Sequence, residues 1–260
     1  MALYEKPVRL LMRDMVADLG LKKAEILTKE RVTSWFEQKY PRVKEGTISA
    51  HLIRLSTNAT SRAHYSARPG DDDLFFQLDG GHFRLYDPST DPVPIYEKPQ
   101  GASSPAPEVA EEREPPTEFA YETDLRDFLA KNLSVLELGL RLYHDEGITG
   151  IEFPAGKRFI DILAVDAQDN LVVVELKVSR GYDRVVGQLL RYMAWVTTHQ
   201  AEAGQNVRGI IVAREISEDL LLACSTLPNI ELFEYQLSVT LQRVQFGGAK
   251  PNMRLEPGAL

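Results

Sequence analysis

The chain has 260 residues, of which 43% are hydrophobic, and this is enough for two domains with apolar cores. Its one cysteine, Cys224, excludes an intrachain disulfide and any zinc site built from several thiolates. The apolar runs are too short to span a bilayer, and the first residues lack the hydrophobic region of a signal peptide. We therefore expect a soluble, cytoplasmic protein that does not act in a membrane.

The first part of the chain is predicted to be helical and to end in a hairpin. Apolar periodicity predicts three helices, over residues 6–19, from Thr28 as N-cap to Pro41, and from Glu45 onward. Alternating apolar residues on both sides of Asp79-Gly80-Gly81 predict a β-hairpin. Three helices followed by a hairpin is the order of a winged helix-turn-helix, so we predict a small domain of this kind over residues 1–87.

The third helix carries a polar stripe opposite an apolar stripe of Ile48, Leu52 and Leu55. The residues of this polar stripe are Thr47, His51, Arg54 and Asn58. A helix that reads the major groove of DNA presents such a face, so we expect the four side chains to be exposed and to bind DNA. Two other interpretations stay open, an ordinary solvated helix face and a domain that binds a protein.

Residues 88–118 hold eight of the fifteen prolines and are rich in Ser, Ala and Glu. They carry seven acidic and two basic side chains, so much of the net charge of −8 lies here. Such a segment buries too little apolar surface to order itself, and we predict an extended linker between two independent domains. Because the acidity is concentrated in this segment, the net charge does not exclude DNA as a partner.

The second domain, residues 119–260, is predicted to begin with a helix and to alternate helices with strands. In the first helix, Leu125, Leu129 and Leu133 form an apolar stripe, and Glu122 lies on the same side. Glu122 is therefore expected to point inward, although an acid near a helix N-terminus also complements the helix dipole. Strands are predicted near residues 140–143 and 150–153, and strand, helix and further strands follow residue 206.

Residues 159–178 predict two strands joined by the turn residues DAQDN. A hairpin centred near Gln168 places Asp161 opposite Glu175, and alternation puts Lys177 on the same face as Glu175. Buried charges are costly unless they pair or bind a metal, so this group indicates a catalytic site. The alternative is a simple cross-strand ion pair between Asp161 and Lys177.

A helix with apolar Val185, Leu189 and Val196 follows the hairpin. Gln188 and Tyr192 are one helical turn apart, so both can face the same site. The sequence therefore places an amide and a phenol next to the predicted carboxylates.

Several motifs occur together in the order of one family. The runs GKRFIDILAVD, VVVELKVSRG and VGQLLRYMAW, preceded by YETDLRDFLAKNLSVLELGL, resemble the catalytic domain of NucS-type endonucleases, a branch of the PD-(D/E)XK superfamily. Gln188-Leu-Leu-Arg-Tyr192 also fits the QxxxY motif of RecB-like nucleases, while Ile160 stands where the superfamily pattern has proline. The resemblance implies an α/β, restriction-endonuclease-like core with a central mixed sheet.

The resemblance further implies a Mg²⁺- or Mn²⁺-dependent endodeoxyribonuclease. Asp161 and Glu175 would hold the metal, Lys177 would position water or stabilise charge, and Glu122, Gln188 and Tyr192 would complete the site. Four arginines flank this site and are expected to hold the DNA backbone: Arg158, Arg180, Arg184 and Arg191.

The first domain departs from the family, whose members carry a β-rich dimerisation region there. The plan of a DNA reader joined to a cleaving domain is typical of restriction, defence or repair nucleases. The alternative is a non-catalytic DNA-binding or regulatory protein that retains the nuclease fold. The sequence does not fix the DNA target or the oligomeric state, for which a homodimer is one expectation.

Overall fold

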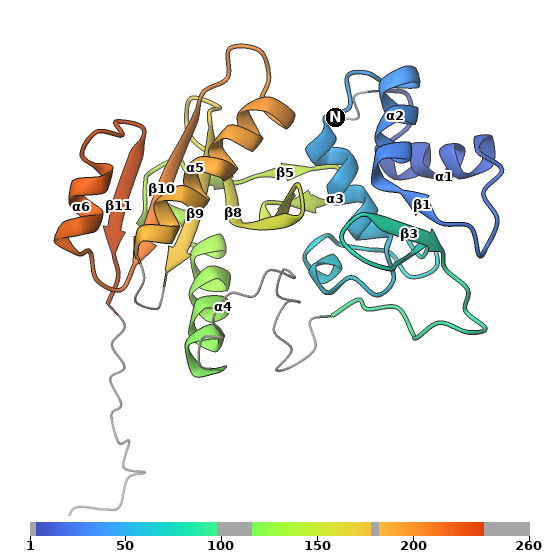
Figure 1. Cartoon of the computed structure of the whole chain (residues 1–260), viewed down its shortest axis with the longest axis horizontal. Helices are drawn as coiled ribbons and strands as arrows, with labels where there is room; N and C mark the ends of the chain where they lie inside the picture. Colours follow the sequence, from blue (N-terminus) through green and yellow to red (C-terminus); the bar gives the residue numbers. More distant parts are fainter. Residues whose placement is uncertain (1–3, 98–115, 178–181, 237–260) are drawn as a thin grey trace, which may run out of the picture.

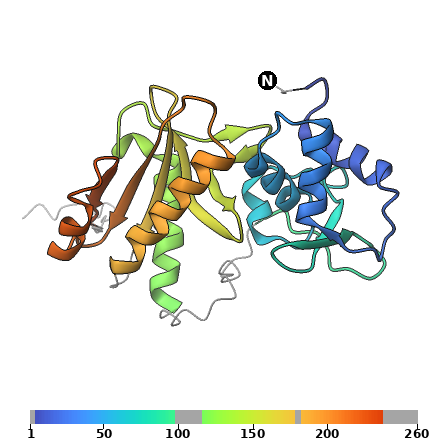
Figure 2. The same cartoon turned by 45° about the horizontal axis from the view of Figure 1, so that its top comes forward.

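The computed structural model describes residues 4–97, 116–177 and 182–236. Figures 1 and 2 show two parts side by side, which we call the N-terminal module (residues 4–97) and the C-terminal domain (residues 116–236). No helix in these described ranges is both long and apolar enough to cross a bilayer.

The N-terminal module consists of three helices and a small sheet. Its elements are α1 (Val8–Asp18), β1 (Leu27–Thr28), α2 (Lys29–Lys39), α3 (Glu45–Leu55), the 3₁₀ helix η1 (Thr60–His64), β2 (Phe75–Gln77) and β3 (His82–Leu85). The helices and the hairpin confirm the predicted order, and Thr28 Oγ1 caps α2 by accepting the backbone N–H of Arg31 at 3.2 Å. Strand β1, which pairs with β3, is too short for periodicity to reveal.

The C-terminal domain is an α/β unit with a mixed sheet, as predicted. Its elements are α4 (Pro116–Lys131), η2 (Leu133–Val135), β4 (Arg141–Leu142), β5 (His144–Asp145), β6 (Ile148–Thr149), β7 (Ile151–Ala155), β8 (Arg158–Val165), β9 (Leu171–Lys177), α5 (Tyr182–His199), β10 (Val207–Ala213), α6 (Glu218–Cys224) and β11 (Ile230–Glu234). The sheet order is β11-β10-β9-β8-β4, and β7 also pairs with β8. Strands β9, β10 and β11 are parallel, whereas β8 runs antiparallel to β9.

Two helices cover opposite faces of this sheet. Val173 in β9 packs in one core with Leu189 and Val196 of α5, while Val172 and Val174 pack in another with Leu125 of α4. Successive side chains of a strand point to opposite faces, so the run of valines is buried on both sides. The same alternation places Glu175, two residues after Val173, on the α5 face.

Helix α3 belongs to both parts of the molecule. Its Ile48 and Leu52 lie in the core of the N-terminal module, whereas Ala50 and Ile53 lie in the core of the C-terminal domain with Phe153 of β7. The predicted independence of the two domains is therefore wrong, because one helix contributes side chains to both cores.

The boundaries of the linker also differ from the prediction. Residues 88–97 pack on the module, where the backbone N–H of Ile95 donates to the carbonyl of Thr57 and Arg62 stacks over the ring of Tyr96. Helix α4 already begins at Pro116. The remainder of the predicted linker, residues 98–115, lies outside the described residues.

A short hairpin, β5–β6, joins the C-terminal domain to the module. The chain leaves the edge of β8 at Tyr143 and returns to it at Gly150. Both positions are fixed by Leu163 of β8, whose carbonyl accepts from Tyr143 N–H and whose N–H donates to the carbonyl of Gly150. At the hairpin's tip, the carbonyl of Glu146 accepts from Arg54 at 2.6 Å, and its carboxylate accepts the backbone N–H of Val8 at 2.6 Å.

Candidate active site

The β8–β9 hairpin has the predicted register. Ile162 pairs with Val174, so the next residues along the ladder, Asp161 and Glu175, lie opposite each other. The regular pairing ends here, and an oxygen of the Asp161 carboxylate accepts the backbone N–H of Leu176 at 2.9 Å. The two acids are thus brought together by turn position and strand alternation.

Glu175 is the most confined of the site carboxylates. The residue is only 4% exposed. Its Oε1 accepts a hydrogen bond of 2.5 Å from the amide of Gln188 on α5. The same amide lies 3.4 Å from the hydroxyl of Tyr192, so the two helix residues face one site as predicted. The other oxygen, Oε2, is buried and has no hydrogen-bond partner.

The electrostatics of this pair reflect burial and like charge. Shielding from water raises the pKa of Asp161 to about 6, and the negative charge of Glu152 adds to this rise. Burial also raises the pKa of Glu175 well above its usual value, and the charges of Asp161 and Glu122 act in the same direction. The ammonium of Lys177 opposes the rise in both pKa values.

Glu122 lies on α4 and is half-buried. Because its charge contributes to the raised pKa of Glu175, it is close enough to the pair to belong to the same site. This placement favours the predicted inward orientation over a role limited to the helix dipole.

The donor set suits a hard divalent cation held by few protein ligands. Mg²⁺ is usually bound through one or two carboxylates together with water and phosphate oxygens. Asp161 and the unpartnered Oε2 of Glu175 offer two such carboxylates. Within the part of the chain that the structure describes, no cluster of three or more His, Cys, Asp or Glu side chains is arranged to hold a metal.

The predicted phosphate-binding arginines differ in their surroundings. Arg158 is the first residue of β8. Burial raises the pKa of Tyr192, and the charge of Arg158 opposes this rise, so Arg158 lies near the site. Arg184 and Arg191 are exposed on α5. Arg180 lies outside the described residues.

The predicted DNA-reading face of α3 is buried, so the expectation that its side chains are exposed is wrong. Thr47 is 7% exposed, His51 0% and Arg54 3%. Nδ1 of His51 lies 2.9 Å from the carbonyl of Thr47, and Arg54 donates to Asp72 Oδ2 and to the Glu146 carbonyl. Asn58, beyond the end of α3, is half-buried and exchanges hydrogen bonds with the backbone of Gln77.

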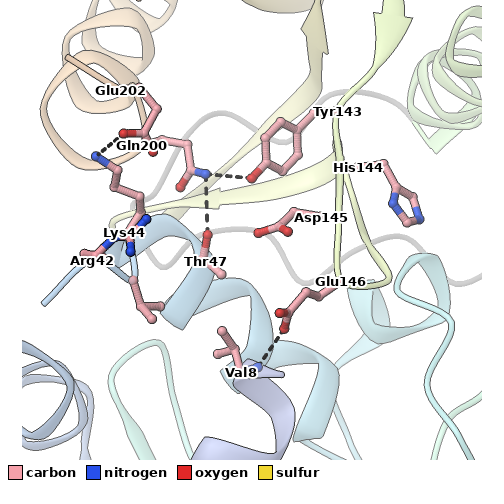
Figure 3. A pocket seen from close by; sticks show the side chains of 11 residues that line it. Val8, Arg42, Lys44, Thr47, Tyr143, His144, Asp145, Glu146, Gln200 and Glu202 are labelled. Atoms are coloured by element: carbon pink, nitrogen blue, oxygen red, sulfur yellow. Dashed lines mark hydrogen bonds and ion pairs between the residues drawn. The ribbon is translucent and has the colours of Figure 1, made fainter. Parts of the chain in front are cut away.

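A cavity of about 290 Å³ lies where the module meets the C-terminal domain (Figure 3). Gln200 at its wall donates to the hydroxyl of Tyr143 at 2.7 Å and approaches Thr47 Oγ1 at 3.5 Å. The residues that line it include neither Asp161 nor Glu175. The cavity is therefore part of the contact between the two parts and separate from the carboxylate site.

Sequence reasoning missed two charged residues beside the site, Arg126 of α4 and Glu152 of β7. Their side chains are 7% and 4% exposed, and Arg126 Nη1 donates to Glu152 Oε1 at 2.5 Å. The one available signal was spacing, because Arg126 follows Glu122 by four residues and so shares its side of the helix.

Two family models match separate parts of the chain. Residues 121–231 match the family model of the endonuclease NucS C-terminal domain, which confirms the resemblance seen in the sequence. Residues 7–85 match a domain of unknown function (DUF7669).

Curated relatives cover the same C-terminal part. Endonuclease NucS of Sulfolobus acidocaldarius is 38% identical over 100 residues, which are 38% of this chain and 36% of the relative. Endonuclease NucS of Pyrococcus furiosus is 34% identical over 110 residues, which are 42% of this chain and 38% of the relative. The chain thus matches less than half the length of these relatives.

Two solved structures with a detected likeness cover about half of this chain or somewhat more. One is described as the crystal structure of a repair endonuclease from Pyrococcus abyssi, with 26% identity, a TM-score of 0.36 and coverage of 49% of this chain and 50% of that one. Another is the structure of an EndoMS–dsDNA complex, with 22% identity, a TM-score of 0.36 and coverage of 61% and 56%.

Proposed function

Because residues 121–231 carry a NucS-type C-terminal domain, we propose that this chain is a metal-dependent DNA endonuclease with a PD-(D/E)XK active site. The observation that carries the proposal is the meeting of Asp161 and Glu175 on adjacent strands, with Gln188 bonded to one oxygen of Glu175 and the other oxygen unpartnered. Most buried side-chain oxygens in proteins have a hydrogen-bond partner, whereas Oε2 of Glu175 has none.

The residues of the site have distinct roles in this proposal. Asp161 and Glu175 would hold Mg²⁺ or Mn²⁺, which supplies an activated water and neutralises charge on the scissile phosphate. Gln188 orients the Glu175 carboxylate through its amide, and Tyr192 supports that amide from one turn further along α5. Lys177, on the same face as Glu175, stabilises negative charge that develops on the phosphate.

The exposed arginines of α5 are proposed to hold the DNA backbone. Arg184 and Arg191 lie on the helix that also carries Gln188, so a strand bound along them passes the carboxylates. Phosphate contacts of this kind position DNA without reading its sequence. Arg158, near Tyr192, would contact the phosphate closest to the site.

The N-terminal module has the element order of a winged helix, three helices with a three-stranded sheet of order β1-β3-β2, and we propose that it is one. Its third helix packs between two cores and does not present Arg54 to DNA. The module is therefore proposed to support the nuclease domain rather than to read bases through α3.

The test is cleavage by the purified full chain in Mg²⁺ or Mn²⁺, with plasmid, mismatched, branched and single-stranded DNA as substrates. Cleavage of at least one DNA, lost on addition of a chelator and in Asp161→Ala, is the expected result. DNA binding without cleavage of any substrate under these conditions would instead identify a non-catalytic protein with a nuclease fold.

A further inference from the structure

Glu152 occupies a special position in β7. The pairs Ile151–Ile162 and Phe153–Ile160 flank it, so it lies opposite Asp161 across the β7–β8 ladder. Its φ of 47° is in the left-handed region, which a non-glycine residue adopts only when its surroundings enforce it. The regular β7–β8 pairing is interrupted between Glu152 and Asp161, next to the point where the β8–β9 pairing ends at Ile162.

Contacts from the N-terminal module hold Glu152 in this conformation. Ser61 of η1 donates to Oε2 at 2.5 Å, and the hydroxyl of Tyr65 donates to the backbone carbonyl of Glu152 at 2.6 Å. Ser61 and Tyr65 are 3% and 0% exposed, so both hydrogen bonds are shielded from water. Glu152 of the C-terminal domain is thus held by hydrogen bonds from two residues of the N-terminal module.

The other oxygen of Glu152 fixes a helix of the active site. Oε1 accepts from Nη1 of Arg126 at 2.5 Å, and Arg126 lies on α4 one turn after Glu122. Leu125 and Leu129 pack α4 on the sheet, but apolar contacts are non-directional and tolerate small rotations of the helix. The buried ion pair adds a direction, because a guanidinium bonds a carboxylate only in a narrow range of geometries.

We propose that Glu152 is a positioning residue of the active site. Held by Ser61 and Tyr65, it fixes Arg126 and thereby the rotation of α4 that directs Glu122 toward Glu175. The module then completes the active site from outside the nuclease domain. The expected effect on cleavage rests on the proposed nuclease function. The placement of α4 by Glu152 does not, because it can be measured without any cleavage.

The test compares Glu152→Gln, Ser61→Ala and their double variant in the full chain. Glutamine keeps the size of Glu152 but removes its charge and replaces one of its two acceptor oxygens with an NH2 donor. Ser61→Ala removes one hydrogen bond from the module. For Glu152→Gln we expect kcat for DNA cleavage to fall about tenfold to a hundredfold with KM nearly unchanged, as for a misplaced catalytic group. For Ser61→Ala we expect a fall of about two- to tenfold, the loss of one hydrogen bond.

Hydrogen exchange supplies the readout that is independent of activity. Both single variants should exchange the amides of α4 faster than the wild type, with the amides of β9 and β10 unchanged. Since both changes act through the Glu152 side chain, the double variant should be little worse than Glu152→Gln alone. The matched control is Glu137→Gln, which breaks a pair with Arg208 away from the site and should leave kcat and α4 unchanged.

Each outcome decides the inference. Unchanged exchange in α4, or faster exchange with wild-type kcat, would overturn it. If Glu152→Gln fails to fold, Ser61→Ala gives the same decision through its smaller effect. If the wild type cuts no DNA, the nuclease proposal fails, and exchange in α4 still decides whether Glu152 positions the helix.

Discussion

Arg54 in the N-terminal module and Glu175 in the C-terminal domain are both buried charged residues, 3% and 4% exposed. Arg54 donates to the carboxylate of Asp72 and to the carbonyls of Ser66 and Glu146, so its charge and its N–H groups are compensated. Glu175 has one amide partner, an unpartnered oxygen and other acids as neighbours, and the ammonium of Lys177 offsets their charge only in part. A compensated buried charge fixes a structure, whereas an uncompensated one is retained for a ligand or a reaction.

The strongest way to break this comparison is to remove a carboxylate from the site. Asp161→Ala and Glu175→Ala should each reduce cleavage by at least about a hundredfold, because a lost metal ligand removes several kcal/mol of transition-state stabilisation. The measurement is kcat/KM with Mg²⁺, and exposed Asp169→Asn, in the turn between the same strands, is the control. Retention of more than about a tenth of wild-type activity in both variants would contradict the assignment.

Stability should move in the opposite direction for the same site. The folded-state pKa of Glu175 is raised above its unfolded value, so its ionised form destabilises the metal-free protein at every pH above the unfolded pKa. Glu175→Gln should therefore unfold at an equal or higher urea concentration than the metal-free wild type at pH 7.

Breaking the compensated cluster should cost stability instead of chemistry. Arg54→Ala should lower the free energy of unfolding by about 3–5 kcal/mol, since it leaves the buried Asp72 with only the backbone N–H of Arg68 and a 4.0 Å ion pair to Arg9. Urea unfolding measures this loss, and Arg31→Ala, which removes an exposed pair with Glu25, should cost less than about 1 kcal/mol. An Arg54 variant of wild-type stability with altered DNA preference would show that α3 is exposed in solution.

The stability of the contact between α3 and the β5–β6 hairpin should depend on pH through His51. Burial lowers the pKa of His51 to about 4, and the charge of Arg54 adds to the lowering, while Asp72 and the bond to the Thr47 carbonyl oppose it. Nε2 also lies 3.8 Å from the carboxylate of Glu146 on the facing hairpin. Because the unfolded chain binds a proton near pH 6.5, stability from this group is present above that pH and falls by about 3 kcal/mol as the pH drops to 4.

Urea unfolding between pH 4 and 7 checks this slope. His51→Gln should flatten it, because it removes the buried imidazole. Equal slopes in wild type and His51→Gln would mean that His51 titrates in the folded protein as it does in the unfolded chain.

The smallest expected loss of stability comes from an exposed hydrogen bond between uncharged groups, the cap of α2 by Thr28. Thr28→Ala removes the cap of α2 and should cost about 1 kcal/mol, while Thr28→Ser keeps the hydroxyl and should cost little. The difference between these two variants in urea unfolding measures the hydrogen bond to Arg31. If Ala and Ser variants are equally stable, the cap does not stabilise the helix.

The geometry of the carboxylate pair could be predicted from sequence because it depends on local rules. A turn at residues 166–170 fixes the register, and alternation then places Asp161 against Glu175. The meeting of Gln188 with Tyr192 follows from the helical repeat in the same way. Each of these contacts spans a short stretch of chain and needs no knowledge of distant segments.

The buried face of α3 could not be predicted, because its partners are distant in sequence. Arg54 is satisfied by Asp72 and by Glu146, 92 residues away. Ala50 and Ile53 beside the polar stripe were a signal, since a helix that is apolar on more than one face is buried. Glu152 gave no signal at all, because its left-handed backbone is imposed by Ser61 and Tyr65 and not by its neighbours in the chain.

Helix α3 in two cores has a consequence for biosynthesis. The module leaves the ribosome before the C-terminal domain. Ala50, Ile53 and Tyr65 therefore stay without their partners until β7 and α5 have been made, which for α5 is more than a hundred residues after α3. The nascent chain therefore carries an uncovered apolar surface for several seconds at the usual rate of about 5–20 residues per second. Its folding should finish late, when β7 and α5 close over a helix that was made much earlier.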